Sequence, residues 1–289
     1  MSTELSIQND LGMSLAEAIG VSSSTGESKS ASLPRVNLMH NAIMGTMDVG
    51  GKSIKTEVVP SGAYKITLGE DKVVYSVNPS IRIFAVRQQW SKWDSENEAM
   101  NKTVMSTDLK GDLKDNMGTF NLGRPTGYIE DWDAVPQKTK DLIRSIKRKK
   151  IVFGMLTATD VTDENGTPVD AITEAMPFVY EVSPSSIKAL DNAMGSLTRK
   201  NILPIQYTFT LGSEEGKLPN GNIYAIMTLG AGDKVEITMD DQKTLKDFVD
   251  YIEYQNSYIL NQWDEKHKEG ISSEDADVVA SFVNVEEAD

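Results

Sequence analysis

The sequence predicts a β-rich α+β protein, built on a largely antiparallel sheet or small barrel that is decorated by helices. Short runs of apolar and β-branched residues recur along the chain and are separated by turn-forming residues. Helical periodicity occurs at only a few places between these runs. Strands and helices do not alternate regularly, which argues against a doubly wound parallel sheet.

The first half of the chain is mainly β in pattern. Between residues 54 and 90 we expect four strands, the first two joined by a Pro-Ser-Gly turn. In the last of them, apolar residues at 81, 83 and 85 alternate with Arg82, Phe84 and Val86, so one face is predicted to be core and the other surface. Residues 94–127 are predicted to be long loops with a short strand near 102–107.

Three helices are predicted in the second half. The first begins after Asp133, with Pro136 in its first turn, and its basic face extends to Lys147 and Arg148. A strand–turn–strand unit and a second helix, capped by Ser183, follow. A β-hairpin around the sequence EEGKLPNG and a long amphipathic helix, 245–263, complete the predicted elements.

Composition divides the chain into three parts: 1–32, 33–263 and 264–289. Residues 21–32, VSSSTGESKSAS, are small and polar, so we expect the first part to be disordered. The second part is predicted to be a single folded domain with helical insertions. The third holds nine acidic residues and two lysines, which is half of the formal net charge of −14, and it is predicted to be a flexible acidic tail.

The composition argues against most enzymes. The chain has no cysteine, and His40 and His267 are its only histidines, so thiolate and multi-histidine metal sites are excluded or very improbable. The glycines of LGRPTG and LGAGD match no phosphate-binding motif and are better explained as turn residues. The acidic pairs Glu130/Asp131 and Asp240/Asp241 would suit Mg²⁺, but helix starts and exposed turns explain them better. We therefore expect no enzymatic activity, no cofactor, no metal and no membrane-spanning segment.

Positive charge is concentrated before one predicted strand. Seven Lys or Arg residues and one acid lie between Lys138 and Lys150, and the run KRKK leads directly into IVFG. A solvated helix surface is the simplest explanation, since cations are favoured near helix C-termini. The alternative is a surface that contacts phosphates, because affinity for nucleic-acid backbones grows with the number of neutralised phosphates.

Aromatic residues near cations favour the nucleic-acid hypothesis. Proteins that bind single strands combine a basic groove with rings on which bases stack. Taken singly, each ring is more often a core residue, but the segment IRIFAVRQQWSKW places three rings among three cations. The predicted DNA-binding residues are Arg82, Phe84, Arg87, Trp90, Lys92, Trp93, Arg124, Tyr128, Arg144, Lys147, Arg148, Lys149, Lys150 and Phe153.

The last residues, SSEDADVVASFVNVEEAD, mix acidic and apolar side chains. A solubilising end is one explanation; a segment that docks on other proteins is the other. The residues predicted to bind partners are Glu274, Asp275, Asp277, Phe282, Glu286, Glu287 and Asp289.

The segments SIRIFAVRQQWSKWD, KRKKIVFG and EDADVVASFVNVEEAD together resemble the bacteriophage single-stranded DNA-binding proteins. The resemblance covers about half of the chain and lies in the arrangement of features. It implies an OB-like fold, sequence-independent binding of single-stranded DNA in phage replication or recombination, and a place in the cytoplasm of the infected host cell. It also implies that the tail recruits replication or recombination proteins. Phe282 lies seven residues from the end, farther than the near-terminal aromatic of some relatives.

Two points stay open at this stage. A phage virion structural or accessory protein without nucleic-acid-binding activity is the alternative function, because acidic and methionine-rich sequence also suits a virion component. Self-association into a homo-oligomer is compatible with the sequence, which does not predict it.

Overall fold

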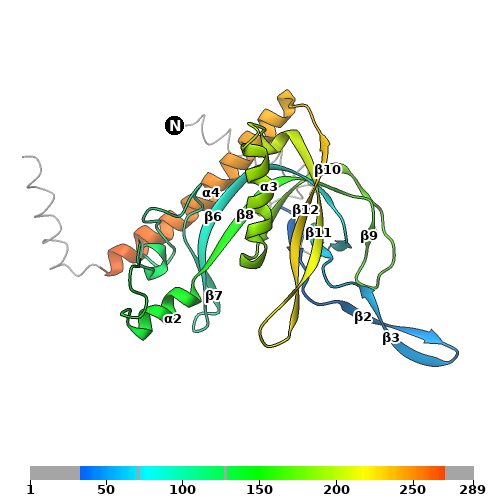
Figure 1. Cartoon of the computed structure of the whole chain (residues 1–289). Coiled ribbons are helices and arrows are strands. Elements are labelled where there is room, and N and C mark those ends of the chain that lie inside the picture. The colour runs from blue at the N-terminus through cyan, green and yellow to red at the C-terminus, as the bar shows by residue number, and fades with distance from the viewer. Residues whose placement is uncertain (1–32, 70–71, 127–128, 271–289) are drawn as a thin grey trace, which may run out of the picture. The chain divides into compact units, whose positions relative to one another are not determined.

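We describe a computed structural model of the chain, which covers residues 33–69, 72–126 and 129–270 (Figure 1). Its strands are β1 (Arg35–Leu38), β2 (Ile43–Val49), β3 (Lys52–Val59), β4 (Tyr64–Thr67), β5 (Val73–Ser76), β6 (Ser80–Asp94), β7 (Ala99–Lys102), β8 (Lys147–Ala158), β9 (Val161–Thr162), β10 (Ile172–Val182), β11 (Tyr207–Lys217) and β12 (Ile223–Lys234). Its helices are α2 (Gln137–Ser145), α3 (Ile187–Thr198) and α4 (Met239–Gly270), with short 3₁₀ turns η1 (Asn121–Gly123), η2 (Pro184–Ser186) and η3 (Pro204–Gln206).

Most strands belong to one mixed sheet of ten strands. Their order is β12-β11-β6-β8-β10-β1-β4-β5-β9, and β7 pairs with the last residues of β6. The pairs β12–β11, β11–β6, β6–β7, β8–β10, β1–β4, β4–β5 and β5–β9 are antiparallel, whereas β1 runs parallel to β10. The predicted β-rich α+β class is confirmed. Within the described residues this sheet is open between β12 and β9, so no closed barrel is formed, and the predicted OB-like fold is not confirmed.

Strands β2 and β3 form a separate two-stranded sheet. The sequence predicts two strands joined by the Pro-Ser-Gly turn, and this turn follows β3; the next strand, β4, pairs with β1 and β5 and not with β3. The turn therefore connects two sheets. Its position was predictable from local residues, whereas the strand partners depend on contacts between distant parts of the chain.

The described chain divides into two compact units. Unit 1 contains residues 33–86 and 150–248, and unit 2 contains residues 87–149 and 249–270. Three elements, β6, β8 and α4, contribute residues to both units.

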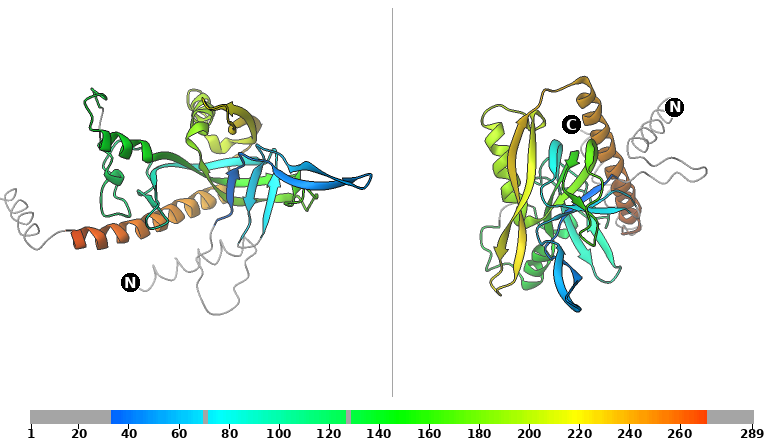
Figure 2. Two further views of the ribbon diagram at one scale, coloured as in Figure 1. Left: turned by 90° about the horizontal axis from the view of Figure 1, so that it is seen from below. Right: turned by 90° about the vertical axis from the view of Figure 1, so that its right-hand side faces the viewer.

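The core of unit 1 follows from the alternation in β6. Ile81, Ile83 and Ala85 are buried, as the sequence predicts, and the two isoleucines join a cluster that includes Phe178 and Tyr180 from β10. Helix α3 lies beside β12 of the β11–β12 hairpin (Figure 2). The predicted cap of this helix differs, because Ser183 precedes the 3₁₀ turn η2 and α3 begins at Ile187.

Strands β6 and β8 approach each other closely at Gly154. A Cβ atom at Gly154 would lie 2.1 Å from the carbonyl oxygen of Arg82 and 3.0 Å from Cε1 of Phe178. No side chain fits between a strand backbone and a buried ring at these distances. Position 154 therefore requires glycine, because any larger residue would clash with the backbone of β6.

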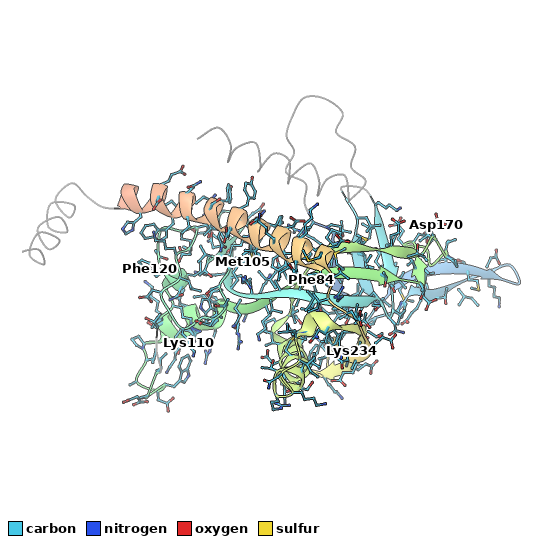
Figure 3. The ribbon with its side chains drawn as sticks, turned by 90° about the horizontal axis from the view of Figure 1, so that it is seen from above. Phe84, Met105, Lys110, Phe120, Asp170 and Lys234 are labelled. Carbon is cyan, nitrogen blue, oxygen red and sulfur yellow. The ribbon has the colours of Figure 1, made fainter. Side chains whose placement is uncertain are left out.

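An ion pair fixes the start of α4 in unit 1. Thr238 and Asp241 cap the helix reciprocally, since the Thr238 N–H donates to Oδ2 of Asp241 (2.7 Å) and the Asp241 N–H donates to Oγ1 of Thr238 (3.2 Å). Arg82 donates two hydrogen bonds to the Asp241 carboxylate, at 2.6 and 2.9 Å. Phe84, two residues further along β6, packs on Phe248 of α4 with ring centroids 5.8 Å apart (Figure 3).

In unit 2, α4 packs on the loops that follow β7. The side-chain amide of Asn256 exchanges two hydrogen bonds with the backbone of Met105, at 2.7 and 2.9 Å. Nε1 of Trp263 donates to the carbonyl oxygen of Thr119 (2.9 Å). The helix continues to Gly270, so residues 264–270, which the sequence assigns to the tail, are helical.

We expect Gly154→Ala to lower the free energy of unfolding by more than about 2 kcal/mol, because overpacking against backbone displaces a strand. Urea unfolding followed by far-ultraviolet circular dichroism measures the change. Gly111→Ala is the matched control, since no atom lies within 4 Å of its added Cβ. Equal stability of the two variants would contradict the close approach of β6 and β8.

The Arg82–Asp241 pair predicts a dependence of stability on pH. Burial acts to raise the pKa of Asp241, but hydrogen bonds from Arg82 and Thr238 and the charge of Arg82 outweigh it and lower the pKa below its usual value. The stabilisation is therefore present above the unfolded pKa of about 3.9 and is lost as pH falls through the lower folded pKa. We expect Asp241→Asn to cost about 1–3 kcal/mol at pH 6.

This deficit of Asp241→Asn relative to the wild type should shrink as pH falls below about 4, because the wild-type carboxylate then becomes protonated. Urea midpoints measured between about pH 6 and pH 2.5 give the two curves. Asp240→Asn is the control, since Asp240 is the exposed neighbour in the same turn. A deficit that stays constant down to the lowest pH would show that the charge of Asp241 contributes nothing.

Candidate nucleic-acid interface

All four tryptophans of the chain lie in unit 2: Trp90, Trp93, Trp132 and Trp263. Three of them have a cation over the ring. The distances to the ring centroid are 4.5 Å for Arg124 over Trp90, 5.9 Å for Lys140 over Trp132 and 4.0 Å for Lys114 over Trp263. The fourth ring, Trp93, is 56% exposed. Cations and aromatic rings thus occur together in this unit, as in proteins that bind single strands.

Trp90 and Arg124 line an open cleft of about 270 Å³ in unit 2. Lys110 and Asn121 also line it, and Leu109, Pro125 and Thr126 complete the wall (Lys110 is labelled in Figure 3). Trp90 is half-buried in β6. An aromatic face beside two cations offers stacking to a planar group and charge to an anionic one.

The loop that carries Arg124 has an unusual backbone. Asn121, Leu122 and Gly123 are all in the left-handed region, with φ of 53°, 60° and 79°. Two non-glycine residues in this region cost about 1–3 kcal/mol each, so surrounding contacts must hold them. The buried carboxylate of Asp115 accepts the N–H of Leu122 (2.7 Å), and Asn121 exchanges hydrogen bonds with the backbone of Leu113 (2.8 and 3.1 Å).

Trp90 and Trp93 do not share a face. They lie three positions apart in β6, and successive side chains of a strand point to opposite faces. Trp93 is paired with Met100 of β7, itself 40% exposed, whereas Trp90 lies on the face of Gln88 and Lys92. The two rings therefore belong to different surfaces of the strand.

The basic run is the start of a strand. The sequence predicts Lys147 and Arg148 on a helix, but α2 ends at Ser145 and both residues belong to β8. Both are exposed. Arg148 donates to Oε1 of Gln88 through Nε (3.1 Å) and Nη2 (2.7 Å), which places it beside the Trp90 face of β6. The β-branched residues Ile151 and Val152, which follow the basic run, favour a strand more strongly than the cations favour a helix.

Lys149 and Lys150 are half-buried, and Lys150 forms an ion pair with Asp191 in unit 1. Of the other predicted cations, Arg87 and Lys92 are half-buried in β6. Arg144 lies in the last turn of α2, where its guanidinium is 3.6 Å from Asp141 and both side chains are 61% exposed.

Three of the predicted DNA-binding residues make contacts within unit 1 instead: two rings pack against α4, and one arginine forms an ion pair. Phe153 is fully buried and packs on Phe248 with centroids 6.0 Å apart, so its ring is not accessible to bases. Phe84 packs on the same ring, and Arg82 is held by Asp241. The predicted alternation along β6 is confirmed, but the predicted surface face at Arg82 and Phe84 is wrong, because α4 covers it in unit 1.

Tyr128 and the seven predicted tail residues lie outside the described residues. The sequence interpretation missed Lys110 and Asn121, because the loop between β7 and α2 carries no periodic pattern. It also missed the strand pairing that brings Arg148 to Gln88. Residues 87–149 carry twelve Lys or Arg and ten Asp or Glu, so any attraction for an anion depends on local arrangement rather than on net charge.

The described residues contain no group of three or more histidine, aspartate or glutamate side chains that could hold a metal ion. None of the helices in residues 33–270 that the structure describes combines the length and apolar character needed to cross a membrane.

Comparison with known proteins found no matching family model, no matching curated protein and no matching solved structure.

Proposed function

We propose that the protein binds single-stranded DNA with little sequence preference, through the face of unit 2 that carries Trp90. The observation that carries the proposal is the cleft in which Trp90 lies beneath the guanidinium of Arg124, next to Lys110. A base stacks on the Trp90 ring, and Arg124 and Lys110 contact the adjoining phosphates. Stacking is tolerant of sequence because every base has a π-face.

The exposed cations at the start of β8 extend this surface. Arg148 is tied to Gln88 on the Trp90 face of β6, and Lys147 is its exposed neighbour. Each phosphate that they neutralise adds about 0.7 to the slope of log affinity against log salt for a single strand. The role implied by the resemblance is phage replication or recombination in the cytoplasm of the infected host cell, with the acidic tail binding replication or recombination proteins.

A second candidate is a virion structural or accessory role. The two-stranded β2–β3 sheet favours it, because Met44, Met47 and Ile54 there are each about half exposed (52%, 55% and 50%). Exposed apolar side chains on a short sheet suit an assembly contact. A protein with only this role would not bind oligonucleotides at any salt concentration.

The stacking prediction compares two tryptophans of one strand. Trp90→Ala should weaken binding of a labelled thymidine oligonucleotide by about 1–3 kcal/mol, roughly 5- to 150-fold, because it removes a ring on which a base stacks. Fluorescence anisotropy of the label measures the affinity. Trp93→Ala, on the opposite face, should have a clearly smaller effect. Equal affinities of wild type and Trp90→Ala would refute the proposed site.

The salt prediction concerns β8. Replacing both Lys147 and Arg148 by alanine should reduce the log–log salt slope by about 1.4, the contribution of two phosphates. The matched control replaces Lys52 and Lys55, two exposed lysines of β3 in unit 1, and should leave the slope unchanged. If both double variants lose the same slope, binding follows net charge and not this surface.

The tail prediction uses a truncation after Gly270, where α4 ends. Residues 271–289 contain six carboxylates and no basic side chain, so they compete with DNA for cations on the same molecule. Their removal should tighten DNA binding at low salt and leave the melting temperature unchanged, as anisotropy and calorimetry would show. A lower melting temperature would mean that the segment contributes to the fold.

A further inference from the structure

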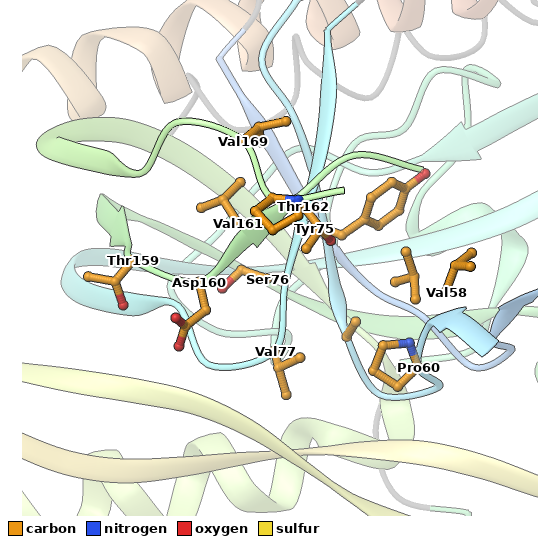
Figure 4. Close-up of a pocket in the computed structure, with 13 residues that line it drawn as sticks. Val58, Pro60, Tyr75, Ser76, Val77, Thr159, Asp160, Val161, Thr162 and Val169 are labelled. Atoms are coloured by element: carbon orange, nitrogen blue, oxygen red, sulfur yellow. The ribbon is translucent and has the colours of Figure 1, made fainter. Parts of the chain in front are cut away.

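A second cavity, of about 290 Å³, lies in unit 1 at the junction of β3, β5 and β9. Valine side chains make up much of its wall, and the carboxylate of Asp160 lies at one side (Figure 4). In this view, Thr159 and Asp160 lie on the side opposite Val58 and Pro60, with Val77 between them. The volume is near the lower end for ligand pockets, which suits one or two amino-acid side chains better than a cofactor.

Part of the apolar wall is exposed to solvent. Val77 is 44% exposed and Val169 is 39% exposed, whereas Val161 of the same cavity is buried. These two valines border one cavity and leave apolar surface exposed to solvent, which an apolar side chain of a partner could cover. Covering them would contribute about 25 cal/mol for each Å² removed from water.

The apolar surface continues from the cavity onto the β2–β3 sheet. Val58 lines the cavity, and its Cγ1 occupies the space above Gly45, where an added Cβ would meet it at 2.5 Å. On the same face of the two strands, Met47 is paired with Ile54, and both are half exposed. An isolated two-stranded sheet is marginally stable in water, so a covering segment would stabilise it.

The rim of the cavity is acidic. Asp160 lines it, and Asp163 and Glu164 follow in the next turn. Asp163 accepts the N–H groups of Thr167 and Asn165 (2.8 Å each), and these hydrogen bonds lower its pKa, so it remains ionised. The pKa of Tyr75, in the cavity wall, is raised by burial and by the charge of Glu164. The charge of Glu164 thus acts on one side chain of the cavity wall.

We propose that this cavity and the adjoining face of β2–β3 bind an extended segment of another protein, in which an apolar side chain enters the cavity and a neighbouring Lys or Arg faces Asp160. The apolar wall selects the inserted side chain, and the acidic rim selects the charge beside it. The chain's own apolar segment 278–285 has the wrong charge, because acidic residues flank it on both sides. The surface thus fits a basic partner, in contrast to the acidic tail.

The test uses two synthetic peptides with the same apolar centre, acetyl-KLFKR-amide and acetyl-ELFED-amide, and isothermal titration calorimetry with the full chain at low salt. We expect the basic peptide to bind and the acidic one not to bind. Asp160→Lys should weaken the basic peptide about 3- to 10-fold, as expected for reversing one exposed charge. Asp233→Lys, an exposed acid of β12 outside the cavity, is the control and should leave the affinity unchanged.

A neutral variant locates the binding site independently. Val169→Asn keeps the charge and should weaken the basic peptide, because it makes the apolar wall polar. Circular dichroism shows that each variant is folded, and oligonucleotide binding should be unaffected in all of them. Equal binding of the two peptides, an unchanged affinity of Val169→Asn, or no binding of the basic peptide at millimolar concentration would each overturn the proposal.

Discussion

The alternation of side chains along β6 is the constraint on which the rest of the structure depends. The strand runs for fifteen residues and belongs to both units. Its odd-numbered residues supply core positions at Ile81 and Ile83, and the buried polar residues Gln89 and Ser91. Its even-numbered residues meet α4 in unit 1 and carry Trp90 in unit 2. A shift of one residue in this register would exchange the two faces throughout.

Local patterns predicted the elements well where one face is buried. The alternation in β6, the β11–β12 hairpin and the amphipathic α4 all follow from periodicity, because burial of one face requires it. The same reasoning wrongly placed Lys147 and Arg148 on a helix. Their helix propensity is outweighed by the strand propensity of the β-branched residues that follow them. This reasoning also left the partners of β3 and β4 open, since a turn sequence shows where the chain reverses and not which strands become neighbours.

The candidate site was predictable only in part. Trp90 and Arg124 were both named from composition, but no pattern relates them, because they are brought together by a loop whose backbone depends on the buried Asp115. Phe153 was predicted as a platform, yet it is a core residue, since an aromatic ring beside a basic run can face either way. Arg82 shows the same ambiguity for a charged residue. It was predicted to contact DNA, but it forms an ion pair with Asp241 at the start of α4.

The placement of every tryptophan in unit 2 has a consequence for spectroscopy. Indole emission and near-ultraviolet absorption at long wavelength report on residues of unit 2, and unit 1 contributes only tyrosine and phenylalanine signals. Far-ultraviolet circular dichroism, by contrast, reports on the backbone of both units, through helices and strands alike. A denaturation curve recorded by indole emission therefore follows unit 2, whereas one recorded by backbone ellipticity follows both units. Their coincidence or separation measures directly how cooperatively the two units unfold.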